Sequence, residues 1–337
     1  MDEQLVFIIS PPRAGSTLLQ RMLAVHEDIC THPEPHLITP LVYLGYFDRV
    51  DRAPYDHINA AEAMRLFVSH LPKQEEDYLD ALRAYANTLY ARMLQQRGGR
   101  YFLDKTPAYA LVLPFLEKLY PRARYVVLTR HPLAVMSSYA NSFFDGDWQT
   151  AHDYNPILAR YVPAMARFLR GTTAPFLQVN YEALVQEPDE QLKRIFAFLD
   201  IPYLAEAVEY DSAKGSSEQG PGDPINVHKK KRPDTQSVHK WARELRASRD
   251  TYDFATTLIA QLDADDLQTW GYNPQTLLEP IYENQSSSLT SVRPTLNWYT
   301  MQRRALMHLR RDVHQRAHGK ILQRVRYYCD VILRDRL

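Results

Sequence analysis

The sequence predicts an α/β protein in which helices flank a parallel β-sheet. Three runs of apolar and β-branched residues have the composition of strands buried on both faces, at residues 5–9, 125–129 and 176–180. A polar turn and a stretch with helical spacing of apolar residues follow each run. Strands that alternate with helices favour a parallel sheet, whose ligands bind at the carboxyl ends of the strands. We therefore expect the functional residues in the loops after these runs.

The first strand-and-helix unit opens the chain. Residues 5–9 read Leu-Val-Phe-Ile-Ile and end at Ser10-Pro11-Pro12, and apolar residues recur at helical spacing from Leu18 onwards. The sequence therefore predicts a strand, a tight loop and a helix.

Two further units follow the same plan. Residues 125–129 precede a polar turn, and a helix is predicted over 133–141. Residues 176–180 have the strand composition, and the helical pattern of 189–199 ends before Pro202.

The rest of the chain divides into helices, a loop and a tail. Residues 59–96 have helical periodicity and are expected to form a helical cap. Residues 211–235 are rich in Gly, Pro, Ser and charge, which predicts a mobile loop or lid. We assign one domain to 1–282, and a linker with a basic, amphipathic C-terminal helical extension to 283–337. The sequence contains no internal repeat.

Charge is unevenly distributed along the 337 residues. The whole chain has 40 Lys and Arg and 40 Asp and Glu, which argues against a generally basic, nucleic-acid-coating protein. The segment 293–337 alone has eleven Lys and Arg and three Asp, a net charge of +8. Its apolar face is expected to pack on its own domain or on a second copy, giving a homodimer, before a membrane. We expect no nucleic-acid partner.

Cysteine content and hydropathy suggest an intracellular chain. Cys30 and Cys329 lie far apart in the sequence and have no metal-binding spacing, so neither a disulfide framework nor a zinc site is indicated. The N-terminus lacks the pattern of a signal peptide, and its apolar run 5–9 is too short to span a bilayer. These features predict a cytoplasmic protein without a transmembrane segment.

The loop 10–17 between the first strand and its helix has the composition of an anion site. Backbone amides at a helix N-terminus attract anions, and the hydroxyls of Ser16 and Thr17 add hydrogen-bond donors. A Walker A loop would have Lys after its last glycine, whereas Ser16 follows Gly15 and the nearest cation is Arg13. This makes a Mg-dependent kinase less favoured, and an ordinary turn is the alternative.

The same loop resembles the 5′-phosphosulfate-binding loop of sulfotransferases that use 3′-phosphoadenosine 5′-phosphosulfate (PAPS). Four further segments resemble motifs of that family, and together the five cover about residues 5–275 in order. These segments are Leu103-Asp104-Lys105-Thr106-Pro107, the pair Arg130 and Ser138, the segment Asn180-Tyr181-Glu182-Ala183-Leu184 with Pro188 and Phe198-Leu199, and the closing region Lys240-Trp241 with Trp270-Gly271-Tyr272. The branch most similar contains tyrosylprotein sulfotransferases and related bacterial and megasynthase enzymes.

The resemblance implies a P-loop-type sheet and a PAPS-dependent reaction. An acceptor oxygen would attack the sulfur in line, adenosine 3′,5′-bisphosphate would leave, and no metal would be required. The implied donor-binding residues are Arg13, Ala14, Gly15, Ser16, Thr17, Arg130, Ser138, Tyr181 and Lys240. Arg13 and Lys105 would also stabilise the charge of the transition state, by roughly 3 kcal/mol each.

The resemblance also points to a catalytic base. Small-molecule sulfotransferases of the cytosol have a histidine where this sequence has Pro107, so the base must lie elsewhere. Glu34 matches the position of the catalytic glutamate in the tyrosylprotein branch, and we predict it as the general base. His32 and His36 are weaker candidates, expected at the surface.

Two positively charged or titratable features have open roles. His239 occupies a position where the tyrosylprotein branch has a serine that contacts the leaving group, and it is either catalytic or structural. The basic run 229–232 either closes over the phosphates or is merely solvated.

Three functions remain after this reading. The leading one is sulfuryl transfer to a hydroxyl of a carrier-protein-bound β-hydroxyacyl chain, of a small alcohol or carbohydrate, or of a peptidyl tyrosine. The tyrosine is disfavoured because no secretion signal is seen. The alternatives are a P-loop kinase-like nucleotide transferase and a non-catalytic nucleotide-binding module.

Overall fold

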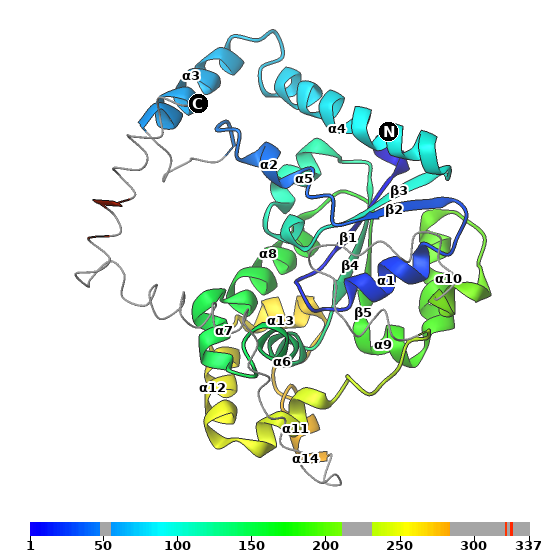
Figure 1. The fold of residues 1–337 in the computed structure, drawn as a ribbon, viewed down its shortest axis with the longest axis vertical. Helices are drawn as coiled ribbons and strands as arrows, with labels where there is room; N and C mark the ends of the chain where they lie inside the picture. The colour runs from blue at the N-terminus through cyan, green and yellow to red at the C-terminus, as the bar shows by residue number, and fades with distance from the viewer. Residues whose placement is uncertain (48–54, 211–230, 284–320, 322–323, 326–337) are drawn as a thin grey trace.

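The computed structural model describes residues 1–47, 55–210, 231–283, 321 and 324–325 (Figure 1). Most of the predicted lid at 211–235, with the first half of the basic run, lies outside the described residues, as do nearly all of the predicted linker and basic tail. Helices in the described ranges are all too short or too polar to cross a membrane.

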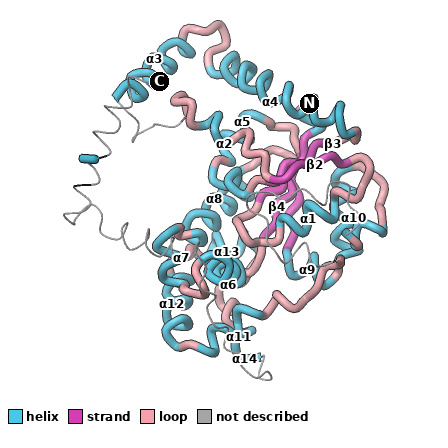
Figure 2. Tube along the Cα trace, in the orientation of Figure 1, coloured by secondary structure: helices cyan, strands magenta, loops and turns pink. Residues whose placement is uncertain are grey.

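A five-stranded parallel sheet forms the centre of the fold, which confirms the predicted α/β class (Figure 2). The strands are β1 (Leu5–Ile9), β2 (Ile29–Pro33), β3 (Tyr101–Lys105), β4 (Arg124–Thr129) and β5 (Phe176–Asn180). They lie in the order β2-β3-β1-β4-β5, and every neighbouring pair is parallel. The register places Phe7 of β1 opposite Asp104 of β3 and Tyr125 of β4.

The three predicted strands are present within one residue of their expected bounds, whereas β2 and β3 were not predicted. Strand β2 ends in Thr-His-Pro and β3 ends in Asp-Lys, so neither is a continuous apolar run. The sheet accepts β2 because an edge strand tolerates proline. It accepts the charged end of β3 because Asp104 and Lys105 find polar partners, as described below.

Helices cover both faces of the sheet. They are α1 (Ser16–Leu23), α2 (Thr39–Val42), α3 (Tyr55–Ser69), α4 (Glu75–Arg97), α5 (Leu113–Leu119), α6 (Pro132–Phe143), α7 (Trp148–Tyr154), α8 (Ile157–Gly171), α9 (Tyr181–Gln186), α10 (Pro188–Leu199), α11 (Lys240–Ala247), α12 (Arg249–Ala260), α13 (Ala264–Trp270) and α14 (Glu279–Glu283), with short 3₁₀ turns η1 (Asp2–Gln4), η2 (Pro107–Leu111) and η3 (Ala205–Val208). The helices predicted over 59–96 are α3 and α4. Helix α4 packs on β2 and β3, whereas α3 extends away from the sheet (Figure 1).

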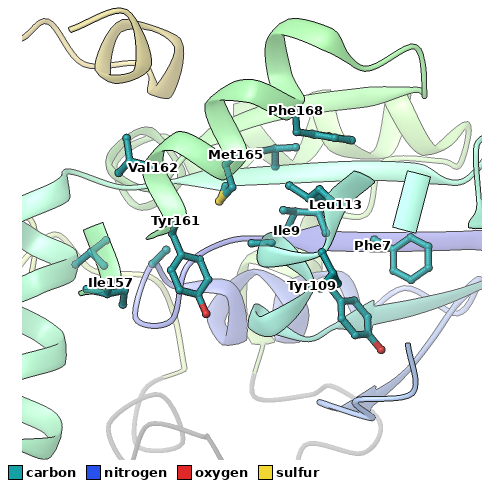
Figure 3. Close-up of a cluster of buried hydrophobic side chains, with 14 of the residues drawn as sticks. Phe7, Ile9, Tyr109, Leu113, Ile157, Tyr161, Val162, Met165 and Phe168 are labelled. Atoms are coloured by element: carbon teal, nitrogen blue, oxygen red, sulfur yellow. The ribbon is translucent and has the colours of Figure 1, made fainter. Parts of the chain in front are cut away.

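The two faces of the sheet carry separate hydrophobic cores. Because side chains alternate along a strand, Phe7 and Ile9 contribute to the core with α4, α5, α6 and α8. Val6 and Ile8 contribute to the opposite core with α1, α9 and α10. Figure 3 shows part of the first core, where side chains of α8 pack over β1. With both faces buried, the carboxyl edge of the strands is left open for ligands.

Candidate active site

A cavity of about 420 Å³ lies at the carboxyl ends of the strands. The residues that follow each of the five strands contribute to its wall. The wall consists of Pro12, Arg13, Gly15, Ser16, Thr17, Leu18, Glu34, His36, Pro107, Ala108, Arg130, Ser138, Phe143, Tyr161, Tyr181, Tyr210, Arg232, Pro233, Asp234 and Ser237. This is the edge at which the sequence analysis expected the ligand.

The loop after β1 forms one side of this cavity and leads into α1. Its backbone takes left-handed conformations at Arg13 (φ 70°) and Gly15 (φ 97°). A Cβ atom on Gly15 would lie 2.4 Å from the ring of Tyr181, so only glycine allows the ring to pack on the loop. The first amides of α1 have no acceptor within the helix and are available to an anion.

Two arginines lie at this loop: Arg13 belongs to it, and Arg130 follows β4. The guanidinium of Arg130, 6% exposed, donates to the carbonyl oxygens of Arg13 (3.0 Å) and Ser237 (3.1 Å) and lies 4.1 Å from the centre of the Tyr181 ring. Arg13 donates to Ser138 Oγ at 3.4 Å. Burial, and then the charge of Arg130, lowers the pKa of Arg13 to about 10, so Arg13 remains a cation at neutral pH. Such a cation pair favours a polyanionic ligand.

Tyr181 begins α9 and completes this side of the cavity. Its hydroxyl group and that of Ser237 are 2.8 Å apart. Asn180 ends β5 and caps α9, because its side chain accepts a hydrogen bond from the amide of Ala183. The cap fixes where Tyr181 enters the helix, and therefore where its ring meets Gly15.

A buried ion pair joins the ends of β2 and β3. Lys105 has no exposed side-chain surface, and its Nζ lies 2.6 Å from Glu34 Oε1 and 3.3 Å from Thr17 Oγ1. Glu34 is 12% exposed, and its other oxygen lies 3.7 Å from His36 Nε2. The pair connects a carboxylate that faces the cavity to the first turn of α1.

Asp104, the residue before Lys105, forms buried hydrogen bonds that support this ion pair. Asp104 is fully buried and accepts hydrogen bonds from the hydroxyls of Tyr90 (2.7 Å), Tyr109 (3.0 Å) and Thr106 (2.9 Å). Burial raises the pKa of Asp104 to about 6, although these hydrogen bonds oppose the shift. The Tyr109 hydroxyl also accepts from the amide of Ile38 at 3.1 Å. The network therefore fixes the segment 34–38, which carries Glu34.

The closing region supports Arg130 rather than lining the cavity. Trp270 Nε1 donates to the carbonyl oxygen of Arg130 at 2.9 Å. The ring of His131 stacks on Trp241 with centroids 4.1 Å apart, and burial lowers the pKa of His131 to about 3. A neutral His131 leaves the local positive charge to Arg130. Tyr272 donates to Glu182, whose other oxygen accepts from the amide of His131.

The structure brings most of the predicted site residues together. Arg13, Gly15, Ser16, Thr17, Glu34, Arg130, Ser138 and Tyr181 line the cavity. Ala14 and Lys105 are fully buried directly behind its wall. His239 and Lys240 are exposed and are not among the lining residues, and Lys240 lies 3.6 Å from Glu244 on its own helix.

Several lining residues were not predicted. Ser237 lies two residues before His239, lines the cavity and contacts both Tyr181 and Arg130. Tyr210 and Asp234 also line the cavity. Tyr161 and Phe143 have the apolar spacing of core residues in their helices, which hid their position at the cavity. In the described ranges, no cluster of three metal-ligating side chains is found.

A model of the sulfotransferase family matches residues 5–205, and this chain belongs to that family. Nodulation protein NoeE of Sinorhizobium fredii is 29% identical over 293 residues, covering 79% of this chain and 65% of NoeE. Protein-tyrosine sulfotransferase 1 of Danio rerio is 23% identical over 220 residues, covering 64% of this chain and 58% of that protein. This chain thus spans about two thirds or less of either relative.

A solved structure has the same fold. The sulfotransferase domain from the Synechococcus PCC 7002 olefin synthase is 26% identical and superposes with a TM-score of 0.51, covering 79% of this chain and 93% of that domain. The family assignment and this fold agree with the resemblance stated from the sequence.

Proposed function

We propose that this protein transfers a sulfuryl group from PAPS to an acceptor hydroxyl by in-line displacement. The observation that carries the proposal is the Lys105 and Glu34 ion pair beside the first turn of α1, since a carboxylate and a cation lie together next to the loop that we propose binds the anion. Membership of the sulfotransferase family supports the reaction class.

The residues of the cavity are suited to the charge and shape of PAPS. Arg130 and Ser138 would hold the 3′-phosphate, and the Tyr181 ring would contact the adenine. Ser16, Thr17 and the amides of the loop 13–17 would hold the 5′-phosphosulfate. Two buried polar atoms, Ser10 Oγ and Arg130 Nε, have no hydrogen-bond partner in the described part of the chain. Of these two, Arg130 lines the cavity, where its Nε would donate to a phosphate oxygen.

Each residue of the ion pair then has a distinct task. Glu34 accepts the proton of the acceptor hydroxyl while the acceptor oxygen forms its bond to sulfur. The bond between sulfur and the bridging oxygen breaks, and its electron pair leaves with adenosine 3′,5′-bisphosphate. Lys105 and Arg13 offset the negative charge that develops on the transferred group and the bridging oxygen. Thr17 orients Lys105 through their 3.3 Å contact.

We also propose that 1–282 is the catalytic unit, because the family match and all lining residues fall within it. The similar solved domain comes from an olefin synthase, and the sequence resembles megasynthase enzymes; among the acceptors considered we therefore favour a hydroxyl on a carrier-protein-bound chain. A small alcohol or carbohydrate and a peptidyl tyrosine are the other acceptors for the assay below.

Calorimetry with adenosine 3′,5′-bisphosphate tests the donor site, and ³⁵S-labelled PAPS with a panel of alcohols tests the transfer. We expect metal-independent binding of the bisphosphate, weakened in Arg130→Met but not in Arg122→Met, an exposed control. Absence of bisphosphate binding would refute the proposal. Binding of Mg-ATP instead would favour a kinase-like nucleotide transferase, and binding without any transfer would indicate a non-catalytic module.

A further inference from the structure

The hydroxyl group of Tyr161 is unusual among the buried tyrosines of this protein. Tyr161 is 5% exposed and lines the cavity, yet its hydroxyl has no hydrogen-bond partner in the ranges that the structure describes. Figure 3 shows the side chain at the margin of the hydrophobic cluster, with the oxygen directed away from Val162 and Met165. The ring of Tyr161 is buried but its hydroxyl opens to the cavity, so the hydroxyl is available to a bound molecule.

Other buried tyrosines form hydrogen bonds within the protein. Their partners are Asp104 for Tyr90 and Tyr109, Leu199 for Tyr101, Asn87 for Tyr120, Leu116 and Tyr120 for Tyr125, Ser237 for Tyr181 and Arg232 for Tyr210. The free hydroxyl of Tyr161 is therefore not a general property of tyrosines in this core. This hydroxyl belongs to a tyrosine that lines the cavity.

Tyr161 lies on the side of the cavity that holds Glu34. Helix α8, which carries Tyr161, packs against η2, which carries Pro107 and Ala108 two residues after Lys105. Burial raises the pKa of Tyr161 to about 12, and the negative charge of Glu34 contributes to this shift. Tyr161 is thus protonated at neutral pH and acts as a hydrogen-bond donor, in contrast to the carboxylate of Glu34.

The wall around these two groups is partly apolar. Pro107 and Ala108 line the cavity there, and His36 Nε2 lies 3.7 Å from Glu34. Arg13 and Arg130 lie on the side of the β1 loop and Tyr181, where the Arg13 guanidinium is 5.6 Å from the centre of the Phe143 ring. The carbon atoms of an acceptor bound beside Glu34 would therefore contact Pro107 and Ala108.

We propose that Tyr161 binds the acceptor by donating a hydrogen bond to its reacting oxygen, and that the acceptor is an uncharged alcohol whose neighbouring carbon atoms are apolar. The inference rests on the proposed sulfuryl transfer and names the acceptor side of that site. It favours an aliphatic hydroxyl, such as that of a hydroxyacyl chain, over a carbohydrate or an acidic peptide.

Tetrahedral geometry explains why this arrangement promotes reaction. An alcohol oxygen has four directions: the bond to carbon, the bond to hydrogen and two lone pairs. The hydrogen points to Glu34, which takes the proton, and one lone pair accepts from Tyr161. The remaining lone pair can then point only at the sulfur, so the two side chains together orient the nucleophile.

The test uses Tyr161→Phe, which removes only the hydroxyl group. Ligand-observed NMR titration follows 1-hexanol binding to the full chain saturated with adenosine 3′,5′-bisphosphate, with methyl glucoside and hexanoate as comparison ligands. We expect 1-hexanol to bind best of the three. We expect its affinity to fall about fivefold in Tyr161→Phe, the factor that a hydrogen bond of ~1 kcal/mol corresponds to. Bisphosphate affinity should not change.

Thermal unfolding separates a binding role from a structural one. The matched control is Tyr120→Phe, which loses the 3.0 Å hydrogen bond to Asn87 outside the cavity wall. Tyr120→Phe should lower Tm and leave 1-hexanol binding unchanged, whereas Tyr161→Phe should weaken binding and leave Tm unchanged. Equal 1-hexanol affinity in wild type and Tyr161→Phe, or no 1-hexanol binding, overturns the inference. Failure of the donor assays above would refute the proposed function separately.

Discussion

The buried ion pair between Lys105 and Glu34 makes a prediction about both stability and activity. Replacement of Lys105 by Met leaves the Glu34 carboxylate in a largely buried site with no cation at contact distance, since the two groups are 2.6 Å apart. Replacement of Glu34 by Gln leaves the fully buried ammonium of Lys105 without its anion. The double replacement leaves two neutral side chains that occupy similar volumes.

The magnitude follows from the geometry. Coulomb's law at 2.6 Å gives a gross attraction of about 6 kcal/mol at an effective dielectric constant of about 20, which desolvation largely offsets. Removal of one partner from a buried pair costs ~3–5 kcal/mol, and the 12% exposure of Glu34 places the cost at the lower end. We expect the double variant to be more stable than the sum of the single effects by about 2–3 kcal/mol.

Urea unfolding of the four proteins measures this coupling. The matched control is the pair Lys193 and Glu190, which is equally close at 2.7 Å but has 51% and 63% exposed side chains. Its cycle should show no measurable coupling, because water screens exposed pairs. All variants with a change at 34 or 105 should lose transfer activity, including the double variant. Additive stability effects at Lys105 and Glu34 would refute the reasoning.

Three further predictions concern the groups around this pair. Gly15→Ala should weaken binding of adenosine 3′,5′-bisphosphate at least tenfold in calorimetry, because its Cβ would lie 2.4 Å from the Tyr181 ring. The control is Gly98→Ala, which is also at positive φ but has no atom within 4 Å of its Cβ, and it should leave binding unchanged. Tyr109→Phe should lower kcat and change KM for the donor little, because the amide of Ile38 loses its hydrogen bond to the Tyr109 hydroxyl. Tyr90→Phe loses only a hydrogen bond to Asp104 and should retain kcat. Equal effects of the two variants on kcat would contradict a positioning role for segment 34–38. The raised pKa of Asp104, about 6, means that the folded state binds its proton more tightly than the unfolded chain. Its contribution to stability is therefore full below about pH 4 and is lost as the pH rises through 6. The difference in unfolding free energy between wild type and Asp104→Asn should change by up to about 3 kcal/mol between pH 4 and pH 7 in urea titrations, and a constant difference would contradict this shift.

The sequence was informative about the fold wherever a strand is buried on both faces. Strand β1 is fully buried along its length and reads as a continuous apolar run, so its bounds were predicted correctly. Strand β3 is equally buried, but Asp104 and Lys105 at its end are satisfied by side chains distant in sequence. Hydrophobic patterning contains no information about partners that are distant in sequence, so β3 was not predicted.

In the candidate site, too, residues in sequence motifs were predicted, whereas a residue placed only by tertiary packing was not. The loop 13–17, Glu34, Arg130 and Tyr181 were selected from ordered motifs, and the structure brings them to one cavity. The position of Tyr161 could not be predicted, because a tyrosine on the apolar face of α8 has the pattern of a core residue. Only the tertiary packing of α8 on η2 places it at the cavity.

The exposed position of His239 has a local reason. His239 precedes α11, whose buried face is formed by Trp241, Ala242 and Leu245, so the residues at its start turn outward. Ser237, which precedes the buried Val238, turns towards Tyr181 instead.

The central claim is that Glu34 removes the proton of the acceptor hydroxyl during sulfuryl transfer. The most direct test is the single-turnover rate of ³⁵S transfer from saturating PAPS in wild type and Glu34→Gln, with Glu190→Gln as an exposed control for the same chemical change. General-base catalysis contributes about 10²- to 10⁴-fold, so we predict a decrease of at least about 100-fold in Glu34→Gln with bisphosphate affinity retained. Equal transfer rates in wild type and Glu34→Gln would contradict the account.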